Sequence, residues 1–323
     1  MTILFYLLAA ALCLVVLLLG WLVFTTRRLA RKAGRMVPPS GRFIEADGTR
    51  FHYSEAGEGP PIVLIHGLGG TLHHFPPALI ARLARHHRVI ALDRSGAGYS
   101  TRRPDRDGRL PDQAAEIKVF IDALGIEKPL IVGHSLGGMI ALTLGVEHPA
   151  AGAGLALISP LTRGFRAPPA SVAGLNIPSR AKRRLIAETV AVPIAARTAE
   201  ATMSFIFAPQ KPTQDYMTAG GGWLGLRPGQ FFAVAGDFTS TAIDINRISA
   251  RYGELKMPVG LLVGDADQVL DFTQQSLPMR EDVAGIDLEI LPGVGHMPQF
   301  VEPERTADFI LRMAGKAFDV PAH

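Results

Sequence analysis

The stretch PLIVGHSLGGMIALTLGVEH, residues 129–148, decides the fold class of this chain. It opens with a short apolar run rich in β-branched residues, which is typical of a strand buried on both faces. The run ends in GHSLG (133–137), and the residues that follow predict a helix. Glycine-rich turns are common, so the five-residue pattern alone is weak evidence. Between a strand and a helix, however, it is typical of a sharp turn that exposes a nucleophilic hydroxyl, here that of Ser135.

Similar strands lie on both sides of this stretch. Strands are predicted over residues 42–46, 50–56, 61–66, 87–93, 129–134, 154–159, 258–264 and 288–291, and helices near 74–85, 112–124, 136–148 and 303–315. Strands and helices that alternate in this way predict an α/β fold with a mostly parallel sheet and helices on both faces. Residues 161–250 interrupt the alternation with helical stretches and no clear strand, which predicts an inserted helical cap.

The N-terminus carries the uncharged apolar run ILFYLLAAALCLVVLLLGWLVF, residues 3–24. As a helix it would be about 33 Å long, enough to cross a bilayer core of roughly 30 Å. A cleaved signal peptide is the alternative. It would need a positive segment before the run and a small-residue cleavage site after it, and the sequence has neither. We therefore expect a single-pass membrane protein whose N-terminal helix has membrane lipids as partners.

The expected organisation is a transmembrane anchor (1–25), a basic linker (26–41), a first core segment (42–160), a helical cap (161–250) and a second core segment (251–323). Five basic residues follow the apolar run: Arg27, Arg28, Arg31, Lys32 and Arg35. The positive-inside rule then predicts that the catalytic domain faces the cytoplasm. These charges also suit anionic lipid headgroups.

Charge and cysteine content exclude several classes of protein. The formal net charge is only +4, and the five basic residues beside the apolar run exceed it. Nucleic acid is therefore not an expected partner. The single cysteine, Cys13, lies inside the apolar run, which excludes an intrachain disulfide and a cysteine-based metal site. We expect no cofactor and no metal.

A serine hydroxyl is a weak nucleophile and needs a base and an acid that orients the base. The best candidate for the base is His296, in the loop after the last predicted strand, at the same sheet edge as Ser135. The segment GDADQV (264–269) follows a predicted strand and supplies the carboxylate. Asp267 is preferred over Asp265, and the order serine, aspartate, histidine is the one that triads of this kind follow.

Acyl transfer also needs donors for the oxyanion that develops. One is expected to be the backbone N–H of Leu136, at the start of the helix after the nucleophile. The other is assigned to Leu68, in the glycine-rich loop HGLGG (66–70). His66 and His134 are expected to brace loops by hydrogen bonds.

The predicted cap contains six large side chains that could form the roof of an apolar pocket or the small core of the cap: Met203, Phe205, Phe207, Trp223, Phe231 and Phe232. His73 and His74 could line the same pocket. A basic run over 180–184 predicts a solvated helix face, with contact to anionic lipid as the alternative.

Five segments together resemble the successive signatures of the α/β-hydrolase superfamily: HGLGG (66–70), DRSGAGYS (93–100), GHSLGG (133–138), GDADQVLD (264–271) and GVGHMPQFVEPE (293–304). The resemblance covers about residues 42–316. Within the superfamily it is greatest to the esterase and monoacylglycerol-lipase branch, which includes members tethered by an N-terminal transmembrane helix. It implies the α/β-hydrolase fold, the triad Ser135, Asp267 and His296, and an oxyanion hole from Leu68 and Leu136. One departure is Ser95, where the usual loop has proline.

We therefore expect a serine hydrolase that cleaves an apolar or lipid-like carboxylic ester, such as a monoacylglycerol, through an acyl-enzyme on Ser135. A C–C hydrolase, a lactonase, an amidase and a cofactor-free haloperoxidase share this triad and stay open. Haloalkane dehalogenases and epoxide hydrolases are disfavoured, because they resemble this fold with an aspartate nucleophile. A hydrolase-fold receptor without activity is the alternative outside enzymes, and the complete triad argues against it.

Overall fold

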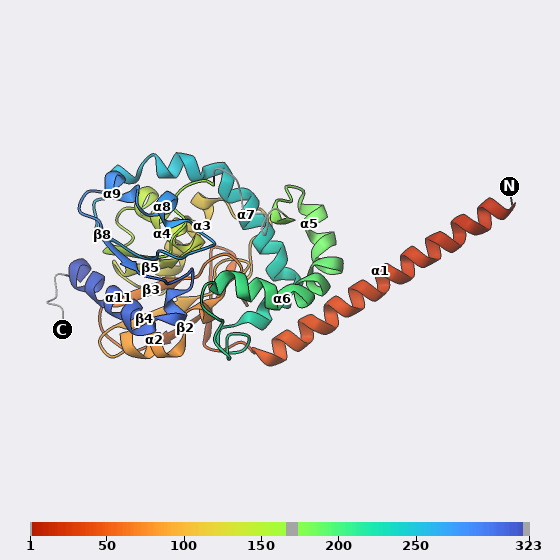
Figure 1. Ribbon diagram of the computed structural model, residues 1–323, viewed down its shortest axis with the longest axis horizontal. Coiled ribbons are helices and arrows are strands. Elements are labelled where there is room, and N and C mark those ends of the chain that lie inside the picture. Colours follow the sequence, from red (N-terminus) through yellow and green to blue (C-terminus); the bar gives the residue numbers. More distant parts are fainter. Residues whose placement is uncertain (1, 166–173, 319–323) are drawn as a thin grey trace.

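The computed structural model describes residues 2–165 and 174–318. Met1 and residues 166–173 and 319–323, which belong to the predicted anchor, cap and second core segment, lie outside the described residues. Figure 1 shows an α/β domain from which the N-terminal helix α1 (Thr2–Met36) extends as one long rod.

The domain is built on one eight-stranded sheet in the order β1-β2-β4-β3-β5-β6-β7-β8. The strands are β1 (Arg42–Ala46), β2 (Thr49–Ala56), β3 (Pro61–Ile65), β4 (Arg88–Leu92), β5 (Leu130–His134), β6 (Gly154–Ile158), β7 (Val259–Gly264) and β8 (Asp287–Leu291). Strand β2 pairs antiparallel with β1 and β4, and every other pairing is parallel. All eight predicted strands and the mostly parallel sheet are confirmed.

Helices cover both faces of the sheet and bury alternate strand residues. The helices of the core are η1 (Leu72–His74), α2 (Pro77–Leu83), α3 (Leu110–Ala123), α4 (Leu136–Glu147), η5 (Tyr252–Glu254), α8 (Phe272–Gln275), α9 (Met279–Asp282), α10 (Pro298–Val301) and α11 (Pro303–Phe318). Val63 and Ile65 of β3 pack with α3 and α4, whereas Ile62 and Leu64 pack with α2 and α11. This alternation follows from the two-residue period of a strand.

Between β6 and β7, the described part of the chain contains helices and no strand. Apart from η5, these helices are α5 (Arg180–Ile186), the π-helical turn η3 (Ala187–Ala191), α6 (Val192–Phe207), the 3₁₀ helix η4 (Gly222–Leu226) and α7 (Pro228–Ser249). We refer to residues 174–249 as the cap. In Figure 1, α5 and α6 lie on the side of the domain from which α1 departs.

Helix α1 continues further than the sequence predicted. Its first part is strongly apolar, with a mean hydropathy of 2.9 over an 18-residue window in which no residue is buried. The predicted linker (26–41) is helical over its first part, because the helix runs on without a break to Met36. The reason is tertiary packing: Thr26 Oγ1 donates to the carbonyl oxygen of Thr189 at 2.8 Å, and Ala33 is buried against the cap.

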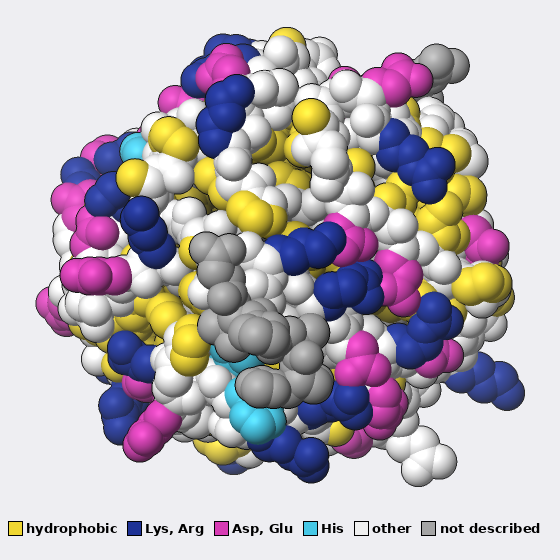
Figure 2. Space-filling model, turned by 90° about the vertical axis from the view of Figure 1, so that its left-hand side faces the viewer, with side chains coloured by type: hydrophobic (Ala, Val, Ile, Leu, Met, Phe, Trp, Pro, Cys, Tyr) yellow, Lys and Arg dark blue, Asp and Glu magenta, His cyan; other side chains and the backbone are white. Residues whose placement is uncertain are grey.

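The face of the domain opposite α1 carries mixed charges. Figure 2 shows Lys and Arg side chains interspersed with Asp and Glu over this face. Strand β8 and helix α11 lie on this side, and Arg312 of α11 pairs with Asp287 and Glu289 of β8 at 3.1 and 2.7 Å. Positive and negative groups therefore balance one another locally on this face.

Candidate active site

The residue at the turn between β5 and α4 is Ser135, whose backbone adopts φ 53° and ψ −119°. A positive φ is rare outside glycine and carries strain, which the packed strand and helix on either side hold in place. The turn leaves no room for neighbouring side chains. A Cβ at Gly133 would lie 2.4 Å from the carbonyl oxygen of Gly137, and a Cβ at Gly137 would lie 2.2 Å from that of Ile65. Close backbone contacts thus require both glycines.

The structure brings together the three side chains of the predicted triad. His296 Nε2 is 3.0 Å from Ser135 Oγ, and His296 Nδ1 is 2.7 Å from Asp267 Oδ2. Asp267 Oδ1 accepts hydrogen bonds from the backbone N–H groups of Val269 and Leu270 at 2.8 and 2.9 Å. The carboxylate is therefore fixed where it accepts the Nδ1 proton, which leaves Nε2 free to accept from the hydroxyl. An imidazole placed in this way can deprotonate a serine.

The loop that carries His296 is held by two residues from other parts of the chain. His134 Nε2 lies 3.0 Å from the carbonyl oxygen of His296, and burial holds the pKa of His134 well below its usual value. Gln210 of the cap accepts from the N–H of Gly295 at 2.9 Å and donates to the carbonyl oxygen of Gly293 at 2.6 Å. The predicted bracing role of His134 is confirmed. Gln210 has no sequence signal, since its partners lie far along the chain.

Other candidates for the base and acid have different partners. Asp265 is exposed and contacts the backbone of the loop before His296 rather than the imidazole. His74 is buried, and its Nε2 lies 3.1 Å from the hydroxyl of Tyr216. Burial, with smaller contributions from His296 and His73, lowers the pKa of His74 to about 3, so that it stays neutral near pH 7.

The predicted oxyanion loop lies beside the nucleophile. A Cβ at Gly67 would lie 3.0 Å from Ser135 Cβ. Leu136 is the first residue of α4, where helical N–H groups have no partner within the helix. Within residues 2–165 and 174–318, no hydrogen-bond acceptor contacts the N–H of Leu68 or of Leu136. Both groups are therefore free to bind an oxygen of a substrate.

A cavity of about 320 Å³ lies between this loop and the cap. On the core side it is lined by Leu68, Gly69, Thr71 and His74, and on the other side by residues of η3, α6, η4 and α7. Among the described residues, its lining includes no Lys, Arg, Asp or Glu. With His74 neutral, the cavity offers an uncharged and mainly apolar surface that begins next to the oxyanion loop.

The predicted roof of this cavity is only partly correct. Met203 and Phe231 do line it. Phe207 instead belongs to a buried aromatic cluster with Tyr216 and Phe300. Phe205, Trp223 and Phe232 do not line the cavity either. Trp223 packs against α1, and the Phe232 ring lies under the guanidinium groups of the basic run, Arg180, Arg183 and Arg184.

Fold and site together define a hydrolase, and comparison with known proteins identifies its family. Residues 60–303, which are more than half of the 323-residue chain, match the family model described as alpha/beta hydrolase fold. The chain belongs to this family.

Two curated relatives and one solved structure are similar to this chain. The chain is 29% identical over 287 residues to a 2-hydroxymuconate semialdehyde hydrolase from Pseudomonas sp. strain CF600, covering 84% of this chain and 93% of that protein. A hydrolase of the same name from Pseudomonas putida is 40% identical over 121 residues, which are 36% of this chain and 42% of that protein. The chain thus spans less than half the length of several curated relatives that it matches.

The solved structure of a bacterial membrane phospholipase A superposes with a TM-score of 0.66 at 23% identity, covering 98% of this chain and 97% of that one. At this identity the likeness shows the fold alone. The coverage includes most of α1 as well as the domain.

Proposed function

We propose that the protein hydrolyses carboxylic esters through an acyl-enzyme on Ser135. The observation that carries the proposal is the pair of hydrogen bonds at His296, 3.0 Å to Ser135 Oγ and 2.7 Å to Asp267 Oδ2. A serine at a strained turn with an aligned imidazole is the arrangement that nucleophilic acyl transfer requires.

In the first half-reaction, Ser135 Oγ attacks the carbonyl carbon while His296 Nε2 takes the hydroxyl proton. The N–H groups of Leu68 and Leu136 stabilise the charge on the carbonyl oxygen. The imidazolium then protonates the alkoxide, which leaves as an alcohol. In the second half-reaction, water adds to the acyl group with His296 again as base, and the free acid is released. Asp267 stays ionised and orients the imidazole throughout.

The cavity supports an uncharged acyl chain as the part of the substrate that is recognised. Its lining includes Met203, Ile206, Leu226 and Phe231, and no charged side chain among the described residues. An alkyl chain gains about 0.8 kcal/mol for each CH₂ group that it buries. The cavity is lined by Leu68, one of the proposed oxyanion donors, so we place the acyl chain there with its carbonyl group toward Ser135.

We further propose that α1 anchors the protein in a membrane, with the catalytic domain on the cytoplasmic side. Its apolar part is long enough to span a bilayer and is unburied in the structure. The helix continues unbroken into a segment packed on the cap, which leaves no extended region after the apolar run for signal cleavage. The basic residues after the run support the orientation. A tethered domain meets esters dissolved in the bilayer, so a monoacylglycerol is the proposed type of substrate.

A C–C hydrolase is the second candidate, and the similarity to 2-hydroxymuconate semialdehyde hydrolase over 84% of this chain favours it. Such an enzyme could use the same triad. A muconate semialdehyde carries a carboxylate, and a pocket for it needs a cationic partner. The described lining of the cavity holds no Lys or Arg, so the pocket is better suited to a neutral ester. Lactonase, amidase and haloperoxidase activity are further alternatives with this triad.

Labelling with a fluorophosphonate probe tests the proposal most directly. The wild-type protein should be labelled at Ser135 and should hydrolyse short p-nitrophenyl esters faster than muconate semialdehydes. Ser135→Ala should lose the label and nearly all turnover, with a residual rate of roughly 10³–10⁴ over water from the remaining groups. Normal ester turnover by Ser135→Ala would overturn the proposed mechanism. Preference for the C–C substrate would leave the nucleophile but change the reaction.

A further inference from the structure

The carbonyl oxygen of Gly67 is bound by three donors at once. His66 Nδ1 lies 2.8 Å from it, Arg94 Nη2 lies 3.1 Å away, and the N–H of Gly70 lies 3.3 Å away. His66 Nε2 accepts from the N–H of Arg94 at 3.0 Å, so His66 is the neutral tautomer with its proton on Nδ1. These bonds fix the direction of the Gly67 carbonyl group.

Fixing this carbonyl also fixes the N–H of Leu68. The two groups belong to one planar trans peptide and point in opposite directions. The three donors lie on the carbonyl side, and Gly67 itself lies against Ser135. The donors that hold the carbonyl therefore determine where the N–H of Leu68 points.

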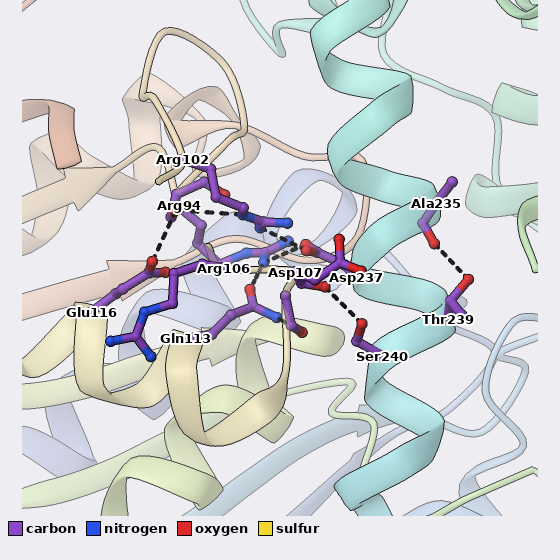
Figure 3. Close-up of polar contacts among 12 residues, drawn as sticks. Arg94, Arg102, Arg106, Asp107, Gln113, Glu116, Ala235, Asp237, Thr239 and Ser240 are labelled. Carbon is purple, nitrogen blue, oxygen red and sulfur yellow. Dashed lines mark hydrogen bonds and ion pairs between the residues drawn. The ribbon is translucent and has the colours of Figure 1, made fainter. Parts of the chain in front are cut away.

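Arg94 is the donor that connects this peptide to the rest of the molecule. Its guanidinium is buried, donates through Nε to the carbonyl oxygen of His66 at 3.0 Å, and pairs through Nη1 with Asp237 at 2.8 Å. Asp237 is also buried and lies on the cap helix α7. Figure 3 shows Arg94 and Arg102 converging on this one carboxylate.

Helix α7 reaches the oxyanion loop a second time through Gln230. Its Nε2 donates to the carbonyl oxygens of Gly69 and Gly70, each at 3.0 Å, and its Oε1 accepts from the N–H of Gly98 at 2.8 Å. Gln230 and Asp237 are about two turns apart and so lie on the same face of the helix. One face of α7 thus holds the loop both directly and through Arg94.

We propose that Arg94 is a positioning residue for the oxyanion hole and that it transmits the position of cap helix α7 to the N–H of Leu68. The inference rests on the proposed function, in which this N–H binds the oxyanion. A displaced donor weakens binding of the transition state and leaves binding of the acyl chain in the cavity unchanged. Loss of the Arg94 contact should therefore lower kcat with little effect on KM.

Arg102 provides a matched control. It is buried, and it pairs with the same Asp237 carboxylate at 2.6 Å. Its other hydrogen bonds among the described residues are to Ser95, and none reaches the loop over 66–70. A structural role of this ion cluster would make the two arginines equivalent. A positioning role makes only Arg94 important for kcat.

The test compares Arg94→Lys, Arg94→Met and Arg102→Met in the full chain, with a soluble p-nitrophenyl ester. Arg94→Lys keeps the charge next to Asp237 but loses the planar guanidinium that donates to the carbonyl oxygens of His66 and Gly67. Removal of an oxyanion donor costs about 10²–10³ in kcat, so a displaced donor should cost roughly 10- to 100-fold. KM should change less than about threefold, and the rate of phosphonylation should fall in parallel with kcat. Arg102→Met should keep kcat within about threefold, since its contacts do not reach the loop.

Gln230→Met is the second variant, because it buries no unpaired charge and should fold even if an arginine variant does not. Its kcat should fall about 3- to 10-fold, a smaller loss than for Arg94 because the Gly67 carbonyl keeps its donors. The inference is overturned if folded Arg94→Lys keeps wild-type kcat, or if Arg102→Met loses as much kcat as Arg94→Lys. If the Arg94 variants do not fold, wild-type kcat in Gln230→Met overturns it. Failure of the proposed function is a separate result: the wild type would not be labelled at Ser135.

Discussion

The carboxylate of Asp265 accepts a hydrogen bond at 2.6 Å from the backbone N–H of Gly293, three residues before His296. Two aspartates therefore follow β7, and both contact the segment that carries the base. Asp265 binds its backbone and is exposed, whereas Asp267 binds the imidazole and has only 3% of its side chain exposed. Asp267 is therefore placed to orient His296, whereas Asp265 supports the loop that carries His296.

Asn at these two positions should therefore have very different effects. Asp267→Asn should lower kcat on the order of 10⁴, because an amide can donate to Nδ1 and so favours the wrong histidine tautomer. Asp265→Asn should lower kcat by less than about tenfold, since the amide oxygen can still accept from Gly293. Steady-state kinetics on a soluble ester check both values. A larger loss for Asp265→Asn would mean that the wrong acid has been assigned.

Glu116 should make the protein less stable at alkaline pH. Its side chain is buried near Arg102 and accepts from Ser95 Oγ at 3.2 Å, and burial raises its pKa to about 7. Because this pKa lies above the unfolded value of 4.5, the folded state keeps a proton that the unfolded chain releases between those pH values. The stability that this proton provides is complete below about pH 4.5 and is lost as the pH rises through about 7.

Glu116→Gln should therefore be more stable than the wild type at pH 8, by on the order of 2 to 3 kcal/mol. The amide oxygen can still accept from Ser95, so the packing is retained. The difference should disappear near pH 5, and urea unfolding at a series of pH values measures it. The exposed Glu127→Gln is the control and should show no such dependence. A Glu116→Gln difference that does not change with pH would contradict the raised pKa.

His74 should make the protein less stable at acid pH. Its folded-state pKa of about 3 lies below the usual 6.5, so the folded state resists a proton that the unfolded chain binds. The stability from neutral His74 is complete above about pH 6.5 and is lost as the pH falls below it. His74→Phe removes the hydrogen bond to Tyr216 and should lower the free energy of unfolding at pH 7 by about 1 kcal/mol. Below pH 6.5 the free energy of unfolding of His74→Phe should rise relative to that of the wild type, by up to about 1.4 kcal/mol per pH unit. Urea unfolding at pH 5 measures this difference.

Sequence reasoning located the strands and the three side chains that meet at Ser135 because each depends on a local pattern. Ser135 follows a buried strand and precedes a helix, and its two glycines meet backbone at 2.4 Å or less, so no other residue fits. Asp267 and His296 follow strands that end at the same edge of the sheet. Parallel strands bring such positions together whatever the intervening sequence contains.

The contacts that support the triad could not be predicted in the same way. Gln210 binds the loop of His296 from 85 residues away, and Arg94 meets Asp237 across 143 residues. Neither pair has a spacing or a periodicity that marks it. The prediction of the cavity roof from the large cap side chains was only partly correct for a related reason. Neighbouring residues of a helix such as Phe231 and Phe232 point in different directions, and only the packing decides which of them lines the cavity.

The proposed orientation of α1 in the membrane can be tested in spheroplasts. The five basic residues after the apolar run should keep the domain on the cytoplasmic side. External protease should therefore leave the domain intact until the spheroplasts are lysed. Digestion in intact spheroplasts would place the domain outside and reverse the proposed localisation.

Truncation of α1 at two positions separates its proposed role in the membrane from its role in folding. A chain without residues 1–25 keeps Thr26 bonded to Thr189, and Ala33 packed against Val192 and Leu226. Its free energy of unfolding should lie within about 1 kcal/mol of that of the full chain, since the apolar window that is removed is unburied. It should hydrolyse soluble esters normally. A chain without residues 1–36 exposes the cap surface under α1. Its free energy of unfolding should fall by roughly 2 to 3 kcal/mol, which corresponds to the apolar surface of a few side chains that are no longer buried.

Both truncated chains should lose activity on long-chain monoacylglycerols in vesicles, because neither is held at the bilayer that dissolves the substrate. Rates per labelled Ser135 allow the full chain and both truncations to be compared on vesicles and on a soluble ester. Equal vesicle activity of the full chain and of the chain without residues 1–25 would count against a lipid substrate, while the triad assignment would stand. The chain without residues 1–36 could lose activity on the soluble ester while the chain without residues 1–25 keeps it. That result would instead show that this end of α1 supports the cap, and through it the cavity proposed for the acyl chain.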